Sequence, residues 1–201
     1  MRLAVRTDEG GEGSVSNRTV DKCAGVAKIL ITHEQIQART KEIAAELDRR
    51  FGSDVPMMVG VLNGAAMFMV DLAREMTIPV TLDFMAVSSY GSSTKSSGVV
   101  RILKDLDDPI EGQRLLVVED IVDSGLTLQY LLDHLRRRNP ADITVVSLLR
   151  KNKPDAIQVQ TDLVGFEIPD EFVIGYGLDY AQKYRNLPYV GVLDPSVIEP
   201  E

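Results

Sequence analysis

The chain has 201 residues, of which 44% are hydrophobic and 26% are charged. This is enough for one domain, or one and a half, with a sizeable core. The single cysteine, Cys23, excludes an intrachain disulfide framework and a cysteine-rich zinc module. A net charge of −8, from 22 basic and 30 acidic residues, disfavours binding to nucleic acid or to anionic membranes, but not to small phosphorylated ligands.

The N-terminal region carries no signal for export or for a membrane. No apolar run reaches the roughly 18 residues of a membrane helix, and residues 1–20 lack the apolar stretch of a secretory signal. We therefore expect a cytoplasmic protein. Residues 8–19 are polar and rich in Gly and Ser, so residues 1–25 are expected to be a flexible leader and residues 26–201 a single domain.

The first half of the domain alternates helices and strands. A capping box at residues 32–35 precedes apolar residues at helical spacing, which predicts a helix over 33–51. The apolar run 57–62 predicts a buried strand, followed by a helix near 65–76 and a strand over 80–88. The small polar residues of 90–98 predict a mobile loop, after which a strand resumes over 99–103.

The second half continues this alternation. Residues 115–118 and 143–149 are apolar runs typical of buried strands, and the helix between them begins at Thr127. Short strands are expected at 173–174 and 189–193. Alternating strands and helices predict an α/β domain with a mainly parallel central sheet flanked by helices, and no second core.

The segment 115–128 carries the strongest chemical signal. A buried strand ends in the adjacent carboxylates Glu119 and Asp120, and a turn with Ser124 and Gly125 leads into a helix. Ligands bind at the carboxyl ends of parallel strands, and a helix start favours an anion, so this turn is expected to bind a phosphate monoester. The carboxylates fit vicinal sugar hydroxyls together with Mg²⁺. The alternative is a turn that only caps its helix.

The form VVEDIVDSGLTL resembles the phosphoribosyl-pyrophosphate signature of the type I phosphoribosyltransferases, in particular the hypoxanthine–guanine phosphoribosyltransferases. Four further segments resemble that family in the same order: a pyrophosphate loop at 61–65, a catalytic loop at 84–91, a purine-contacting segment at 148–151 and a base-binding hood at 164–180. The resemblance covers roughly residues 26–195. It implies the fold of that family, with a small C-terminal hood at about 160–195 and a mobile loop.

The resemblance also implies roles at the sugar phosphate. Glu119 and Asp120 hold the ribose hydroxyls and a Mg²⁺, and Asp123 is the general base that takes the proton from N7 of the purine. A second Mg²⁺, carried by pyrophosphate, is bound by Asp179. The 5′-phosphate is expected to be wrapped by Asp123, Ser124, Gly125, Leu126 and Thr127, and pyrophosphate to be bound by Leu62, Asn63, Gly64 and Arg185.

At the base, the resemblance implies that Lys151 donates to the purine O6 and that Phe172 stacks on the ring. The Val173 backbone reads the N1/N2 edge, Asp179 lies at this purine-binding hood as well, and Ser89 and Tyr90 close over the site. From the residues alone, other interpretations stay open. Lys151 has basic neighbours typical of surface charge, Phe172 fits an ordinary core aromatic, and Asp179 with Arg185 fits a surface ion pair.

One position departs from the family pattern. Asn63 stands where the family commonly has Lys, which leaves the role of its side chain open and removes a positive charge from the pyrophosphate loop. A cis peptide bond at Leu62–Asn63 is a family feature and is expected here.

The resemblance implies a purine salvage enzyme that transfers phosphoribosyl from 5-phosphoribosyl 1-pyrophosphate to N9 of hypoxanthine or guanine, with Mg²⁺ as cofactor. The products are IMP or GMP and pyrophosphate. Xanthine stays open as a third base, and a homodimer or homotetramer is expected. The alternative function is a regulatory protein of the same fold that senses phosphoribosyl pyrophosphate without catalysis, which the net charge disfavours if it binds nucleic acid.

Overall fold

The computed structural model describes residues 24–89, 100–154 and 156–197. Within these ranges the main sheet has six strands in the order β4-β3-β2-β5-β6-β7, and only the pair β3–β4 is antiparallel. The predicted mainly parallel sheet is therefore confirmed. Its strands are β2 (Met57–Leu62), β3 (Thr81–Ser89), β4 (Val100–Lys104), β5 (Arg114–Val122), β6 (Asp142–Lys151) and β7 (Leu163–Ile168).

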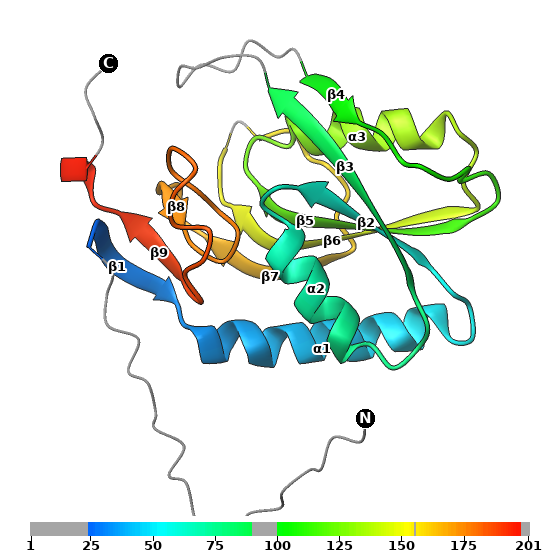
Figure 1. The fold of residues 1–201 in the computed structure, drawn as a ribbon, viewed down its shortest axis with the longest axis horizontal. Coiled ribbons are helices and arrows are strands. Elements are labelled where there is room, and N and C mark those ends of the chain that lie inside the picture. Colours follow the sequence, from blue (N-terminus) through cyan, green and yellow to red (C-terminus); the bar gives the residue numbers. More distant parts are fainter. Residues whose placement is uncertain (1–23, 90–99, 155, 198–201) are drawn as a thin grey trace, which may run out of the picture.

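Helices cover both faces of this sheet (Figure 1). The helices α1 (His33–Phe51) and α2 (Ala66–Glu75) pack on one face, in a core that includes Met58 and Val118. The helix α3 (Leu126–Arg136) packs on the other face with Val59 and Val117. Successive strand residues face opposite sides, so a strand buried on both faces needs the continuous apolar runs seen in the sequence.

The predicted helices agree with the structure because their start signals are local. Thr32 caps α1: its hydroxyl accepts from the Gln35 N–H, and the Gln35 side chain accepts from the Thr32 N–H. Residues 66–75 form α2 close to the predicted 65–76. The predicted start of α3 at Thr127 is one residue late, because Gly125 is the N-cap and Leu126 is already helical.

A second, smaller sheet was not anticipated. It consists of β1 (Val26–Ile31), β9 (Val190–Leu193) and β8 (Val173–Ile174), all antiparallel. Val26, Ile174, Tyr189 and Leu193 form a small apolar cluster of their own. A short 3-10 helix, η1 (Pro195–Val197), follows β9.

The region 160–195 is divided between the two sheets. β7 pairs with β6 in the main sheet, whereas β8 and β9 lie in the small sheet. The first strand of the small sheet comes from the start of the domain, where Val26 pairs with Leu193. The small sheet is therefore built from both ends of the described chain. No helix among the described residues is long and apolar enough to span a bilayer.

Candidate functional site

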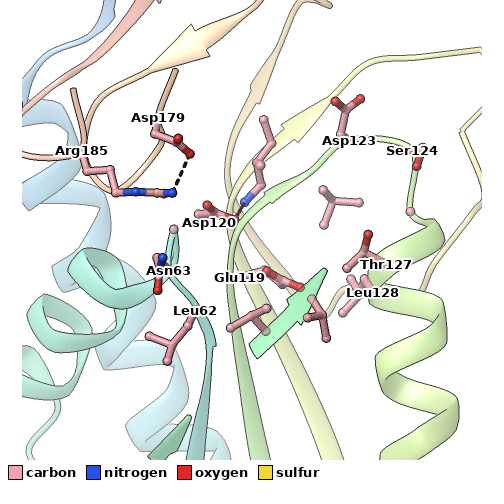
Figure 2. Close-up of a pocket in the computed structure, with 16 residues that line it drawn as sticks. Leu62, Asn63, Glu119, Asp120, Asp123, Ser124, Thr127, Leu128, Asp179 and Arg185 are labelled. Atoms are coloured by element: carbon pink, nitrogen blue, oxygen red, sulfur yellow. Dashed lines mark hydrogen bonds and ion pairs between the residues drawn. The ribbon is translucent and has the colours of Figure 1, made fainter. Parts of the chain in front are cut away.

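A cleft of about 390 Å³ lies at the carboxyl ends of β2 and β5, between the start of α3 and the loop that carries Asp179 and Arg185. This is the edge at which ligands bind to open parallel sheets. Figure 2 shows Glu119 and Asp120 of β5 in the middle of this space, with Ser124 and Thr127 on one side and Arg185 and Asn63 on the other.

The acidic wall of the cleft is formed by Glu119 and Asp120. The prediction placed these carboxylates where the strand ends, but β5 continues to Val122 because its ladder with β6 extends that far. Neighbouring strand residues face opposite sides. Asp120 therefore lies toward Asn63 and Arg185, and Glu119 lies toward the side of α3 (Figure 2).

Both carboxyl groups have a raised pKa. Burial raises the pKa of Glu119 well above its ordinary value, and the neighbouring charge of Asp120 adds to this effect. Burial also raises the pKa of Asp120 to about 6, although the Ile121 N–H donates to its carboxylate at 2.7 Å. Desolvation is thus the largest cause of the raised pKa of both carboxyl groups.

The opposite wall is rich in backbone donors. The N–H groups of Ser124, Gly125 and Thr127 have no acceptor within the described part of the chain, and they lie at the start of α3. Gly125 has a φ of 81°, and a Cβ there would come within 2.6 Å of the Ile157 carbonyl oxygen. Only glycine fits this turn, and the turn leaves its amides free for an anion.

The loop at the end of β2, residues 62–64, forms part of the cleft wall. The Leu62–Asn63 peptide bond is cis, as predicted. A Cβ on Gly64 would overlap the carboxylate of Asp120, and the Gly64 carbonyl in turn lies against Gly177 of the hood. The loop is therefore packed between β5 and the hood, with the Asn63 side chain at the cleft (Figure 2).

Asp179 and Arg185 form an ion pair of 2.7 Å at the edge of the cleft (Figure 2). Arg185 also donates to the Gly177 carbonyl at 2.7 Å, and the Gln182 N–H donates to Asp179 at 2.9 Å. Both side chains line the cleft, so this pair is part of the site and not a remote surface pair.

Lys151 ends β6 next to the cleft, and its side chain is only 10% exposed. Its ammonium group donates to Oδ2 of Asp123 at 3.2 Å. The interpretation of Lys151 as ordinary surface charge is therefore wrong. Lys153 and Asp170 complete the same cluster. Lys153 lies in the turn after β6, and the sequence marks it only as a basic neighbour of Lys151.

Phe172 and Val173 lie in the hood. Phe172 is 50% exposed and meets the ring of Tyr180 edge-on, with 5.8 Å between the ring centroids, so it is not a core aromatic. Val173 pairs with Val192 on one side, and β8 is the edge strand of its sheet. An exposed ring and a strand edge with free backbone groups are suited to a flat polar heterocycle.

The structure gathers most of the predicted residues in one place, but not all. The cleft is not lined by Leu126, Lys151, Phe172 or Val173. Ser89 is the last residue of β3 and is not among the lining residues either. Tyr90 lies outside the described residues, as do the predicted mobile loop and residues 1–23. The predicted residues that line it are Leu62, Asn63, Gly64, Glu119, Asp120, Asp123, Ser124, Gly125, Thr127, Asp179 and Arg185. The apolar lining residues Val61, Val87, Ile121, Val122 and Leu128 carried no distinct signal in the sequence.

The carboxylates do not form a closed metal cage. Within the described ranges, no three acidic, histidine or cysteine side chains are close enough together to hold an ion by themselves. Mg²⁺ ordinarily takes only one or two protein carboxylates and completes its shell with water and phosphate oxygens. The buried, oxygen-only donors Glu119 and Asp120 fit such an ion, because a cation would stabilise charges that burial disfavours.

Comparison with known proteins agrees with this arrangement. The model of the phosphoribosyl transferase domain family matches residues 27–181. The hypoxanthine-guanine phosphoribosyltransferase of Bacillus subtilis is 51% identical over 174 residues, which cover 87% of this chain and 97% of that protein. A protein of the same name from Mycobacterium tuberculosis is 52% identical over 183 residues, covering 87% of this chain and 89% of its own length.

Solved structures give the same result. A hypoxanthine phosphoribosyltransferase from Staphylococcus aureus has a TM-score of 0.82 and 42% identity, and the match covers 88% of this chain and 96% of that one. The enzyme of the same name from Trypanosoma cruzi, in complex with the product IMP, has a TM-score of 0.81 and 40% identity and covers 88% and 98% of the two chains.

Proposed function

The chain belongs to the phosphoribosyl transferase domain family, and from this premise we propose that it is a hypoxanthine–guanine phosphoribosyltransferase of purine salvage. It transfers the phosphoribosyl group of 5-phosphoribosyl 1-pyrophosphate to N9 of hypoxanthine or guanine. The products are IMP or GMP and pyrophosphate.

A single observation carries this proposal: one cleft has a wall of carboxylates and, facing it, a wall of free backbone amides. The amides of Ser124, Gly125 and Thr127 and the start of α3 bind the 5′-phosphate, together with the side chains of Ser124 and Thr127. Glu119 and Asp120 accept hydrogen bonds from the ribose hydroxyls. The sugar phosphate is thus held between the two walls.

Substitution at C1 of the ribose develops positive charge on the sugar and negative charge on pyrophosphate. The carboxylates of Glu119 and Asp120 stabilise the sugar, and Arg185 and the amides of the 62–64 loop bind the leaving group. Arg185 is prepared for this role by its bonds to Asp179 and to the Gly177 carbonyl. Asp123 accepts the N7 proton of the purine as N9 attacks C1.

The proposed cofactor is Mg²⁺. Glu119 and Asp120 would hold one ion beside the ribose, and Asp179 a second beside pyrophosphate. When bound, Mg²⁺ neutralises the charge that develops on the leaving group.

The base is proposed to bind between the hood and the end of β6. Lys151 donates to O6, Phe172 stacks on the ring and Val173 reads the N1/N2 edge with its backbone. The half-exposed ring of Phe172 and the edge position of β8 support these roles. Xanthine remains a candidate third base. Ser89 and Tyr90 are proposed to close over the bound substrates.

A homodimer or homotetramer in the cytoplasm completes the proposal. Met67 and Val70 on the outer side of α2 are 45% and 44% exposed, which supports a contact between subunits at this helix. Size-exclusion chromatography with light scattering measures the mass: a single 22.2 kDa species at micromolar concentration would contradict an oligomer.

The proposed activity is tested by a spectrophotometric assay with hypoxanthine, guanine and xanthine, phosphoribosyl pyrophosphate and Mg²⁺. We expect turnover of hypoxanthine or guanine that is lost on chelation of Mg²⁺. The matched control is Asp123→Asn, and wild-type activity no higher than that of this variant would contradict the proposal. Comparing kcat/KM for the three bases identifies the preferred one.

A further inference from the structure

Two lysines, not one, contact the carboxylate of Asp123. Lys151 donates to Oδ2 at 3.2 Å, and Lys153 is ion-paired with Oδ1 at 2.5 Å. Both ammonium groups also meet Oδ1 of Asp170, at 3.2 and 3.1 Å. The four side chains form a closed ring of alternating charge in which each lysine has two carboxylate partners.

The local chain geometry explains why both lysines reach the same place. β6 ends at Lys151, and the Lys153 N–H donates back to the Lys151 carbonyl at 3.2 Å. The Asn152 N–H donates to the Ile168 carbonyl at 3.0 Å, which ties this turn to the end of β7. The turn folds the chain back after β6, so the Lys153 ammonium group reaches the same two carboxylates as the Lys151 ammonium group.

The two contacts on Asp123 are not equivalent. Oδ1, the oxygen that faces Lys153, has almost no exposed surface, whereas 47% of the Asp123 side chain as a whole is exposed. Lys153 is therefore at the shielded oxygen, and the oxygen held by Lys151 is the one on the more accessible side. A base that reaches Asp123 would meet Oδ2.

The proposed reaction requires Lys151 to change partners. Lys151 must turn to O6 of the purine, and Oδ2 must become free to accept the N7 proton. A carboxylate that loses its only cation in a partly desolvated site is costly and would draw the lysine back. With Lys153 still on Oδ1, Asp123 keeps one cation and a fixed orientation while Lys151 leaves.

We infer that Lys153 is a positioning residue for the base site, one that neutralises and orients Asp123 when Lys151 turns to the 6-oxygen of the purine. This inference rests on the proposed function. It makes Lys153 a determinant of selectivity for 6-oxopurines, because only a base with an oxygen at C6 draws Lys151 away from Asp123. Asp170 is the anchor that holds Lys153 in place.

The test uses Lys153→Met, with Lys153→Arg as the conservative variant. Lys41→Met is a control that removes an exposed lysine of α1, which has no ion pair with any described residue. We expect Lys153→Met to raise KM for hypoxanthine by about tenfold, the loss typical of one partner of a partly buried charge pair. KM for phosphoribosyl pyrophosphate should stay within twofold. In Lys153→Arg the KM for hypoxanthine should return most of the way to the wild-type value. In Lys41→Met it should equal the wild-type value.

A second measurement separates positioning from folding. The inhibition constant of purine itself, which has no oxygen at C6, should be the same for the wild type and Lys153→Met, and it reports a folded base site. An unchanged KM for hypoxanthine, or an equal loss for hypoxanthine and for purine, would overturn the inference while wild-type turnover leaves the proposed function standing. A wild type that uses no 6-oxopurine would overturn the proposed function, and the inference with it.

Discussion

The carboxylate of Asp120 lies directly against Gly64, so closely that a methyl group at that position would overlap it. This contact joins the 62–64 loop, the proposed pyrophosphate site, to the strand β5. Gly64→Ala must displace either the loop or the carboxylate, and we expect kcat/KM for phosphoribosyl pyrophosphate to fall by about 100-fold, as for other misplaced catalytic groups. Gly52→Ala is the control: nothing lies within 4 Å of its Cβ, and the backbone cost of its φ of 61° arises at the end of α1. Steady-state kinetics measure kcat/KM for both variants. A wild-type value in Gly64→Ala would show that the contact between Gly64 and Asp120 does not matter for the reaction.

Asp123→Asn tests the general base directly. The amide keeps the shape of the side chain but accepts a proton poorly, so we expect kcat to fall by about 10²–10⁴-fold. Binding of phosphoribosyl pyrophosphate should change little, because the proposed phosphate contacts come from the turn after Asp123. Single-turnover rates and the KM of each substrate measure this. A loss confined to KM for phosphoribosyl pyrophosphate would assign Asp123 to the phosphate site instead.

Asp120→Asn should stabilise the free protein while it impairs the enzyme. Because the folded pKa of about 6 exceeds the ordinary value of 3.8, this carboxylate costs stability above pH 6, and the cost fades as the pH falls from 6 toward 4. At pH 7.5 the variant should therefore unfold with a free energy higher by about 2–3 kcal/mol. At pH 5 the difference in the free energy of unfolding between the variant and the wild type should be smaller.

Denaturant titrations of Asp120→Asn in EDTA at pH 7.5 and 5.0 measure this difference. Asp108→Asn is the matched control, because it removes an exposed carboxylate. A variant that is less stable than the wild type at pH 7.5 would show that Asp120 has a stabilising partner.

Gly125→Ala tests the proposed phosphate site at the start of α3. The substitution adds a methyl group 2.6 Å from the Ile157 carbonyl in a residue with φ of 81°. We expect KM for phosphoribosyl pyrophosphate to rise by about tenfold or more, and stability to fall by about 1–3 kcal/mol. Gly112→Ala shares the positive φ, 70°, without a steric neighbour, so it reports the backbone cost alone. Equal kinetics for the two variants would contradict a phosphate site at Gly125.

Tyr176 connects the hood to α2. Its hydroxyl donates to Asp71 at 2.7 Å, and burial and the charge of Asp71 raise its pKa, so it stays a neutral donor. Tyr176→Phe should cost about 1–3 kcal/mol of stability because it leaves a carboxylate oxygen short of a donor. Thermal unfolding measures this, with the exposed Tyr130→Phe as control. Equal melting temperatures would show that Asp71 finds another donor.

The sequence predicts most of the main sheet because its signals are local. Continuous apolar runs mark β2, β5 and β6, and the capping box at Thr32 marks α1. β1 was missed because Val26–Ile31 is a short edge strand interrupted by Lys28, and its partner β9 lies at the other end of the domain. Such a pairing depends on tertiary contacts that no window of the sequence contains.

The same limit applies to the site. The residues of 119–127 are contiguous, so their chemistry is visible in the sequence. The ring of Lys151, Lys153, Asp123 and Asp170 joins three segments, and a pattern search interprets Lys153 only as a basic neighbour. Its contact with Asp123 becomes visible only once β5, β6 and the hood are placed side by side.

The pairing of Val26 with Leu193 brings the first and last strands of the domain together at the small sheet. A short linker between these strands would therefore close the polypeptide into a ring without disturbing the cleft, and new termini opened at the exposed turn after α3, near Pro140, would give a circular permutant with the same tertiary contacts. In such a permutant the edge strand β1 and the central strand β9 of the small sheet would be covalently continuous.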